Sequence, residues 1–165
     1  MVAETTLFID LKALAHNYRV LRQKLHKDTK FLAVIKAGAY GHAPGPLAKK
    51  LVALGVDYFG VAYAVEGAEL RSAQVDTPIL LLHPMAAHFE QILQNKLEPS
   101  LYSVALIRQW IAFLESKNIV DYPVHLKFNS GLNRLGVSPE DLPEIIALLQ
   151  NSKALKLLSV FSHLG

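Results

Sequence analysis

The chain has 165 residues, 52% of them hydrophobic and 19% charged, so it is long enough for about one domain and too apolar for a disordered segment. Its formal net charge of +3 comes from scattered basic residues, which favours a solvated surface over a nucleic-acid-binding patch. The longest apolar stretch, Tyr58 to Val65, is far shorter than the roughly 20 residues that span a membrane. Neither a nucleic acid nor a membrane is therefore an expected partner.

The N-terminal segment and the side-chain inventory exclude several classes of protein. Met1 to Glu4 carries an acid where a signal peptide would carry basic residues, so a cytoplasmic protein is expected. The absence of cysteine excludes disulfides and a thiolate nucleophile. His83 and His88 are five residues apart, which is not the helical spacing of a zinc pair, and no metal site is expected.

Helical patterns with readable ends occur along the chain. The first follows Asp10, a capping residue, and its apolar positions are spaced by three and four residues. These positions are Leu11, Leu14, Tyr18, Leu21 and Leu25. Further helices are expected from Pro46 to a stop at Gly55, after Ser103, and after Ser138, where a proline and an acid follow the cap residue.

Between the helices lie short apolar runs of strand length, rich in branched and aromatic residues. They cover residues 31–36, 58–62, 78–82, 97–101, 124–128 and 157–161, and the fourth, interrupted by Pro99, is the weakest. Alternation of strand and helix predicts an α/β fold with a parallel sheet. The spacing suits a doubly wound sheet or a barrel, but the sequence has no G-x-G-x-x-G motif after the first strand and no Walker lysine.

We therefore predict a (β/α)8 TIM-type barrel with about six of its eight strands in this chain. A closed barrel of this kind takes roughly 200 residues or more. Residues 1–165 are accordingly expected to form the N-terminal part of the barrel of a longer protein. No linker, internal repeat or low-complexity tract divides the chain.

Catalytic groups of such barrels come from the carboxyl ends of the strands, and three predicted strand ends carry unusual residues. Lys36 ends the first strand, Lys127 lies within the fifth and is separated from Arg134 by a glycine-containing turn, and His163 ends the sixth. A lysine at a strand end is most often a solvated charge. In a pocket that desolvates it, the pKa of Lys36 would fall and its amine would form a Schiff base with a carbonyl compound. Tyr40 is either a rim aromatic or a phosphate ligand, and Lys127 and Arg134 could face one anion.

These residues resemble those of the alanine racemase family, pyridoxal-phosphate enzymes of fold type III. The segment AVIKAGAYGH, from Ala33 to His42, is similar to the family's cofactor-lysine motif, and HLKFNSGLNRLG, from His125 to Gly136, is a second match. Weaker matches lie at residues 8–11, 61–62 with 66–71, 78–82 and 161–163. Together they cover nearly the whole chain in the expected order.

The resemblance implies roles for the residues around the cofactor, pyridoxal 5'-phosphate. Lys36 would hold it as an internal aldimine and act as one catalytic base. Tyr40 would contact its phosphate, Leu82 would line the pocket and His163 would lie against the pyridine ring. The family usually has Asn or Asp where this chain has Gly38.

For the substrate, the resemblance implies that Arg134 binds both the carboxylate and the phenolic oxygen of the cofactor. Lys127 matches a lysine that is often carbamylated in the family and helps to position this arginine. The sequence departs from the usual Asp-Thr at Asn129 and Ser130, which bears on the surroundings of Lys127.

The activity implied is the racemisation of L-alanine and D-alanine, which supplies D-alanine for cell-wall peptidoglycan. The family's opposite-face tyrosine base comes from the C-terminal domain of the partner in a homodimer, so the 165-residue chain alone is expected to be inactive. Three alternatives stay open at this stage. They are a pyridoxal-phosphate-binding barrel without racemase activity, a barrel without a cofactor, and a racemase acting on serine or another small amino acid.

Overall fold

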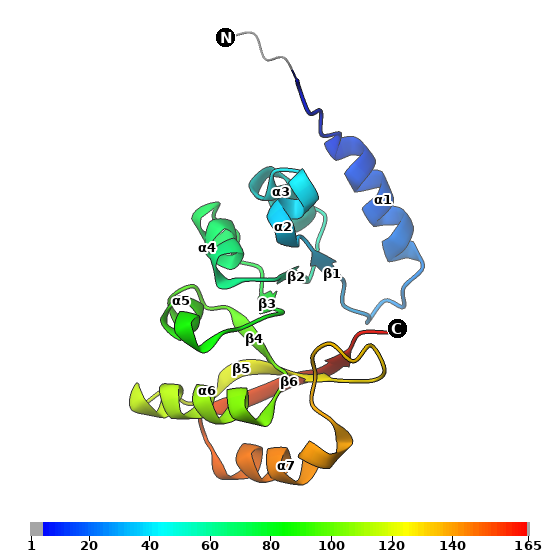
Figure 1. The fold of residues 1–165 in the computed structure, drawn as a ribbon. Helices are drawn as coiled ribbons and strands as arrows, with labels where there is room; N and C mark the ends of the chain where they lie inside the picture. Colours follow the sequence, from blue (N-terminus) through cyan, green and yellow to red (C-terminus); the bar gives the residue numbers. More distant parts are fainter. Residues whose placement is uncertain (1–4, 165) are drawn as a thin grey trace.

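A six-stranded parallel sheet forms the centre of the computed structural model, which describes residues 5–164 (Figure 1). Its strands are β1 (Leu32–Val34), β2 (Tyr58–Val61), β3 (Ile79–Leu81), β4 (Glu98–Leu101), β5 (Tyr122–Phe128) and β6 (Leu155–Ser162). Each strand pairs with its neighbour in the sequence. This order is that of a (β/α) barrel, because a doubly wound sheet reverses its strand order. The predicted fold class is confirmed, and within residues 5–164 the barrel is not closed, since β1 and β6 are both edge strands.

Helix α1 (Leu11–Gln23) precedes β1, and the other helices follow strands β1 to β5 on the outside of the sheet (Figure 1). They are α2 (Lys36–Gly41), α3 (Pro44–Ala53), α4 (Ala64–Ser72), α5 (Phe89–Gln94), α6 (Val104–Ser116) and α7 (Leu142–Asn151). Short 3-10 turns, η1 (Ala86–His88) and η2 (Pro139–Asp141), precede α5 and α7. The predicted strand over residues 31–36 is shorter in the structure, because Lys36 already belongs to the short helical turn α2.

The predicted helix caps are confirmed. The Asp10 carboxylate accepts a hydrogen bond from the Lys12 amide at 2.7 Å, and the Ser103 hydroxyl accepts one from the Leu106 amide at 3.2 Å. Ser138 begins the 3-10 turn that leads into α7. Asp10 and Ser103 each provide an acceptor for an amide that has no partner inside its helix, whereas at Ser138 the Asp141 carboxylate accepts bonds from the Ser138 amide and hydroxyl.

Two details of the predicted helices are wrong. Helix α3 begins at Pro44 rather than Pro46. The predicted apolar face of α1 is only partly buried, since Tyr18 is 6% exposed but Leu21 is 52% exposed. Helix α1 lies at the edge of the sheet, and the Tyr18 ring packs on Phe31 with 4.9 Å between the ring centroids. Helix α1 packs against α3 and the residue before β1, and this contact buries a narrower stripe of the helix than the sequence pattern predicts.

The hydrophobic core lies between the sheet and the surrounding helices. Phe59 of β2 and Leu81 of β3 are fully buried, and Trp110 of α6 packs edge-on against Phe89 with 4.6 Å between the ring centroids. The weakest predicted strand forms, with Pro99 in register with Leu81. Because successive side chains of a strand point to opposite faces, the remaining strand residues face the concave interior of the sheet.

Candidate active site

A cavity of about 860 Å³ lies on the concave face of the sheet and reaches the carboxyl ends of the strands. Its volume is within the range of small-molecule sites, roughly 300–1,000 Å³. The six residues that the sequence singled out for the site all line it. They are Lys36, Tyr40, Leu82, Lys127, Arg134 and His163. The structure thus brings together side chains that lie up to 127 positions apart in the sequence, from 36 to 163.

The half-buried Lys36 begins a turn of left-handed helix. Residues 37–40 have φ between 53° and 59° and ψ between 37° and 49°. This conformation costs roughly 1–2 kcal/mol for each residue other than glycine, and here only Gly38 avoids that cost. At the end of the turn, the ring Nδ1 of His42 lies 2.9 Å from the carbonyl oxygen of Ala39. Strained backbone of this kind concentrates at functional sites, where surrounding contacts hold it in place.

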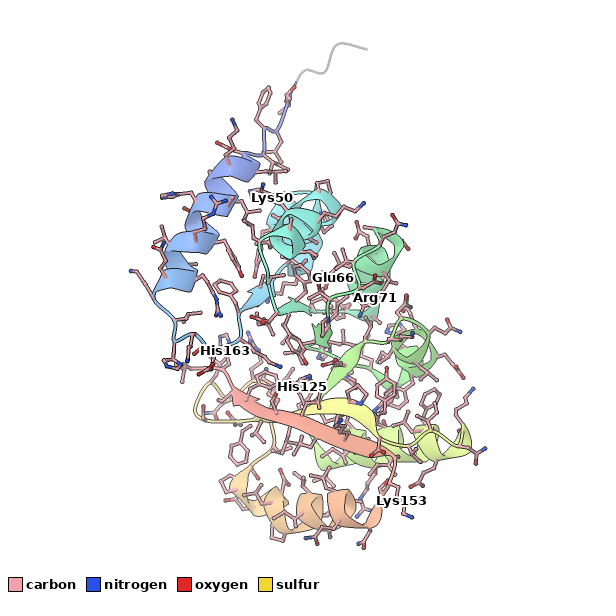
Figure 2. All side chains as sticks on the ribbon, turned by 180° about the vertical axis from the view of Figure 1, so that it is seen from behind. Lys50, Glu66, Arg71, His125, Lys153 and His163 are labelled. Atoms are coloured by element: carbon pink, nitrogen blue, oxygen red, sulfur yellow. The ribbon has the colours of Figure 1, made fainter. Side chains whose placement is uncertain are left out.

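Glu66, in the first turn of α4, contacts the start of the left-handed turn (Figure 2). Its Oε1 accepts a hydrogen bond from the Ala37 amide at 2.6 Å. Its Oε2 accepts bonds from the amides of Ala62, at 2.7 Å, and Tyr63, at 3.0 Å. One carboxylate therefore joins the loop after β1 to the loop after β2.

Lys127 is the most deeply buried of the basic residues in the cavity wall, with 6% of its surface exposed. Burial, together with the charges of Arg134 and Lys36, lowers the pKa of the Lys127 amine. Arg134 is exposed on the loop that follows β5. The amide of Val137 closes the base of this loop by donating to the Lys127 carbonyl oxygen at 2.8 Å. The fold thus holds two cationic groups at one wall of the cavity.

A polar cluster around the buried His125 lies on the concave face of the sheet, next to Lys127 on β5. The Nε2–H of His125 donates to the Glu98 carboxylate at 2.8 Å, and its Nδ1 lies 2.7 Å from the Ser159 hydroxyl. The Tyr58 ring is edge-on to His125 with 6.0 Å between the centroids. Burial, and then the charge of Glu98, raise the pKa of Tyr58 to about 12. This cluster was not predicted from the sequence, although Glu98, an acid inside an apolar strand pattern, was a signal that a partner was needed.

Aromatic rings from three successive loops contact one another beside the cavity. His83 stacks on Tyr102, with 5.6 Å between centroids, and Tyr63 meets His83 edge-on at 5.6 Å. The Tyr102 hydroxyl donates to the carbonyl oxygen of Pro84 at 3.0 Å. The sequence analysis considered His83 only as a metal ligand, whereas its contacts here are aromatic.

The charge of the cavity wall is strongly positive. Lys30, Lys36, Lys127 and Arg134 line it, and no acidic residue of the described chain is among its lining residues. Apolar side chains, among them Leu82 and Phe161, complete the wall. This combination suits a ligand that carries more than one anionic group on an apolar ring.

Residues 5–164 contain neither a metal-binding cluster nor a membrane-spanning helix. No three His, Cys, Asp or Glu side chains in that range are grouped so that they could hold a metal ion. No helix in that range has both the length and the apolar character needed to cross a membrane.

Comparison with known proteins gives consistent matches along the chain. Residues 9–165 match the family model described as "Alanine racemase, N-terminal domain". The chain is 36% identical to a curated alanine racemase of a Geobacter species over 163 residues. That alignment covers 96% of this chain and 42% of the relative, so the chain spans about two fifths of the length of such relatives.

Solved structures agree with the sequence comparison. The structure is similar to alanine racemase of Clostridium difficile, with a TM-score of 0.88 and 34% identity, over 94% of this chain and 41% of that one. It is also similar to alanine racemase of Bartonella henselae with covalently bound pyridoxal phosphate, with a TM-score of 0.85 and 28% identity. The second match covers 95% of this chain and 46% of the other.

Proposed function

The chain belongs to the alanine racemase family through its N-terminal domain, and from this premise we propose that the protein interconverts L-alanine and D-alanine with pyridoxal 5'-phosphate as cofactor. The observation that carries the proposal is the convergence of all six predicted site residues on one cationic cavity. Residues 1–165 would supply the first part of the cofactor-binding barrel.

The lining of the cavity fits this cofactor. Pyridoxal phosphate combines a phosphate, a phenolic oxygen and an aldehyde on an apolar ring. The cavity offers an amine at Lys36, a hydroxyl at Tyr40, a guanidinium at Arg134, and the rings of His163 and Phe161. Lys36 would hold the aldehyde carbon, Tyr40 the phosphate and Arg134 the phenolic oxygen, while Leu82 and His163 would lie against the ring.

When bound, pyridoxal phosphate delocalises the negative charge that is left when the α-carbon of an amino acid loses its proton. The Lys36 amine would remove or return that proton on one face of the substrate. Arg134 would bind and orient the substrate carboxylate through its planar guanidinium. An apolar cavity wall would exclude water from the reacting carbon.

Lys127 would support Arg134 as a carbamate. The neutral amine adds to carbon dioxide with the release of one proton, and the carbamate carries a negative charge. The lowered pKa of Lys127 and its burial beside Arg134 support this proposal, because a neutral amine is the reactive form and the product would offset the positive charge of the wall.

Inversion needs a second base on the opposite face of the substrate, and we propose that the C-terminal domain of a partner subunit supplies it. The protein would then act as a homodimer, and the 165-residue chain alone would be inactive. D-alanine made in the cytoplasm would serve peptidoglycan synthesis in the cell wall.

Covalent mapping of the cofactor tests the proposal most directly. The full-length protein is incubated with pyridoxal phosphate, reduced with borohydride and digested, and the labelled peptide is identified. We expect the label at Lys36, together with visible absorbance that Lys36→Ala abolishes and alanine racemisation that disappears with it. Lys30→Ala, which removes another lysine of the same cavity wall, should keep all three signals. Label found elsewhere, or no label, would contradict the proposal.

A further inference from the structure

Glu66 makes more hydrogen bonds than the start of its own helix requires. It is the third residue of α4, and its bonds to the amides of Ala62 and Tyr63 satisfy groups at the entrance of that helix. The third bond, from the Ala37 amide, belongs to a different loop, 29 residues earlier in the sequence. Capping of α4 does not account for this third contact.

The left-handed turn needs an acceptor at this point. Within the turn, the Ala39 amide donates to the Ile35 carbonyl oxygen at 3.0 Å, and the His42 amide donates to Gly38 at 3.1 Å. Ala37 lies before Ala39, the first residue whose amide is bonded within the turn. In the described structure, the Ala37 amide donates its hydrogen bond to Glu66. An amide without a partner would favour opening of a turn whose conformation is unfavourable for Ala37.

The position of Lys36 depends directly on that amide. The N–H that Glu66 binds belongs to the peptide group between Lys36 and Ala37. This planar group adjoins the Lys36 α-carbon, so the carboxylate fixes its orientation. Glu66 is itself fixed to the end of β2, which pairs with β1 in register. A displacement of about 1 Å at a reacting group lowers its rate by roughly 100-fold.

We propose that Glu66 is a positioning residue for Lys36: its carboxylate holds the left-handed turn against the end of β2 and thereby aims the Lys36 amine into the cavity. This inference rests on the proposed role of Lys36 for its functional meaning, although the contact between Glu66 and the turn stands apart from any cofactor. The cross-loop bond, rather than the cap of α4, is the part of the contact that matters.

Two substitutions separate the cross-loop bond from the cap. Glu66→Asp keeps the charge and the ability to cap α4 but is one methylene shorter, so it cannot reach both loops. Glu66→Gln keeps the length but replaces one acceptor oxygen with an NH2 group, which would face an amide donor. Glu69→Gln makes the same change of charge at an exposed position of the same helix and is the matched control.

The test compares two lysines of the same cavity in the full-length protein. Each folded variant is treated with pyridoxal phosphate and borohydride, and the rate of labelling at Lys36 is divided by the rate at the exposed Lys30. We expect this ratio to fall at least about tenfold in Glu66→Gln and in Glu66→Asp and to stay within about twofold in Glu69→Gln. A general loss of stability would affect both lysines and leave the ratio unchanged.

A measurement without cofactor separates this inference from the proposed function. Amide hydrogen exchange at Ala37 should become faster in both Glu66 variants and stay unchanged in Glu69→Gln. If Lys36 is not labelled in the wild-type protein, the proposed function fails while the exchange data still test the contact. The inference would be overturned if Glu66→Asp had the same labelling ratio and the same Ala37 exchange rate as the wild-type protein. Capping of α4 alone would then suffice to position Lys36.

Discussion

The two ends of helix α4 hold neighbouring loops by opposite charges. At one end, the Glu66 carboxylate accepts hydrogen bonds from three backbone amides beside the cavity. Toward the other end, the Arg71 guanidinium donates to four backbone carbonyl oxygens at 2.5–3.2 Å (Figure 2). Those carbonyls belong to Val75, Thr77, Asn95 and Lys96. Both side chains satisfy backbone groups. The Glu66 end holds four consecutive left-handed residues, 37–40, whereas the Arg71 end has two isolated residues with positive φ, Gln74 and Lys96.

This contrast follows the general division of labour in a barrel. The loops at the carboxyl ends of the strands carry the chemistry, whereas the loops at the amino ends contribute to stability. The loops that Arg71 binds contribute no residue to the cavity wall, and four of the five guanidinium N–H groups have a backbone acceptor. At the cavity, by contrast, Lys127 and Arg134 leave positive charge facing the open interior. The comparison predicts that substitutions near Arg71 cost stability and that substitutions near the cavity alter both stability and binding.

The largest expected effect is the loss of stability in Arg71→Met. The substitution leaves four carbonyl oxygens without their donor, and hydrogen bonds to charged groups contribute about 1.5–3 kcal/mol each without adding up fully. We expect the free energy of unfolding in urea to fall by about 3 kcal/mol. Arg108→Met, which removes an exposed ion pair with Glu144, should cost less than about 0.5 kcal/mol. Unchanged stability with impaired cofactor binding in Arg71→Met would break the comparison.

A smaller loss of stability is expected at the loop that carries Arg134. Gly136 has a φ of +142°, and a Cβ added there would meet the backbone nitrogen of Asn129 at 2.5 Å. Gly136→Ala should therefore lower the free energy of unfolding by about 2 kcal/mol and weaken cofactor binding, because the loop must move.

Gly131→Ala is the matched control for this loop. Its φ is +131°, but a Cβ at Gly131 would meet no atom within 4 Å. Its cost should be limited to the unfavourable φ, about 1 kcal/mol. Equal losses in the two variants would show that the close backbone contact of Gly136 contributes nothing.

The elements that the sequence predicted correctly are those specified by local patterns. Apolar runs specify the six strands, and Asp10 and Ser103 cap their helices through bonds to residues two or three positions away. Lys36 and His163 were expected at strand ends, where barrel sites lie, and both line the cavity. These signals need no knowledge of distant partners.

The features that the sequence did not predict depend on contacts between distant segments. The turn at residues 37–40 is left-handed although alanine favours right-handed helix, so local preference indicates the wrong conformation. The pairing of Glu66 with Ala37 spans 29 residues, and that of His125 with Glu98 spans 27. The sequence identifies a polar residue such as Glu66 or His125, but it does not predict which distant residue that side chain contacts.

A gain in stability is expected when the buried charge beside the cavity is removed. The folded protein has a lowered pKa at Lys127, whereas the unfolded chain has the ordinary value of about 10.4. The unfolded state therefore binds more protons between these two pKa values, and stability rises with pH across that interval. Below it, the folded protein bears the full cost of the buried ammonium group.

Lys127→Met should remove that cost. In buffer free of bicarbonate, we expect the free energy of unfolding at pH 7 to rise by about 1 kcal/mol, and the gain should shrink as the pH approaches 10. Lys156→Met, at an exposed position of β6, should change stability little at either pH. A loss of stability at pH 7 in Lys127→Met would show that the amine has a favourable partner in the folded chain.

The smallest expected effect concerns the strain of the left-handed turn itself. Ala37 is exposed and has a φ of 53°, a conformation that glycine adopts without a steric cost. Ala37→Gly should therefore raise the free energy of unfolding by about 0.5 kcal/mol, because the relief of strain exceeds the greater entropy of glycine in the unfolded chain. The same exchange at Ala147, exposed in the right-handed helix α7, should lower it by about 0.5–1 kcal/mol. Opposite signs for one chemical change, measured by urea denaturation, would show that the cavity end of the fold retains strain that its sequence could remove. If both substitutions lowered stability, Ala37 would not be strained in the folded protein. Contacts such as the hydrogen bond to Glu66 would then offset the cost of its positive φ.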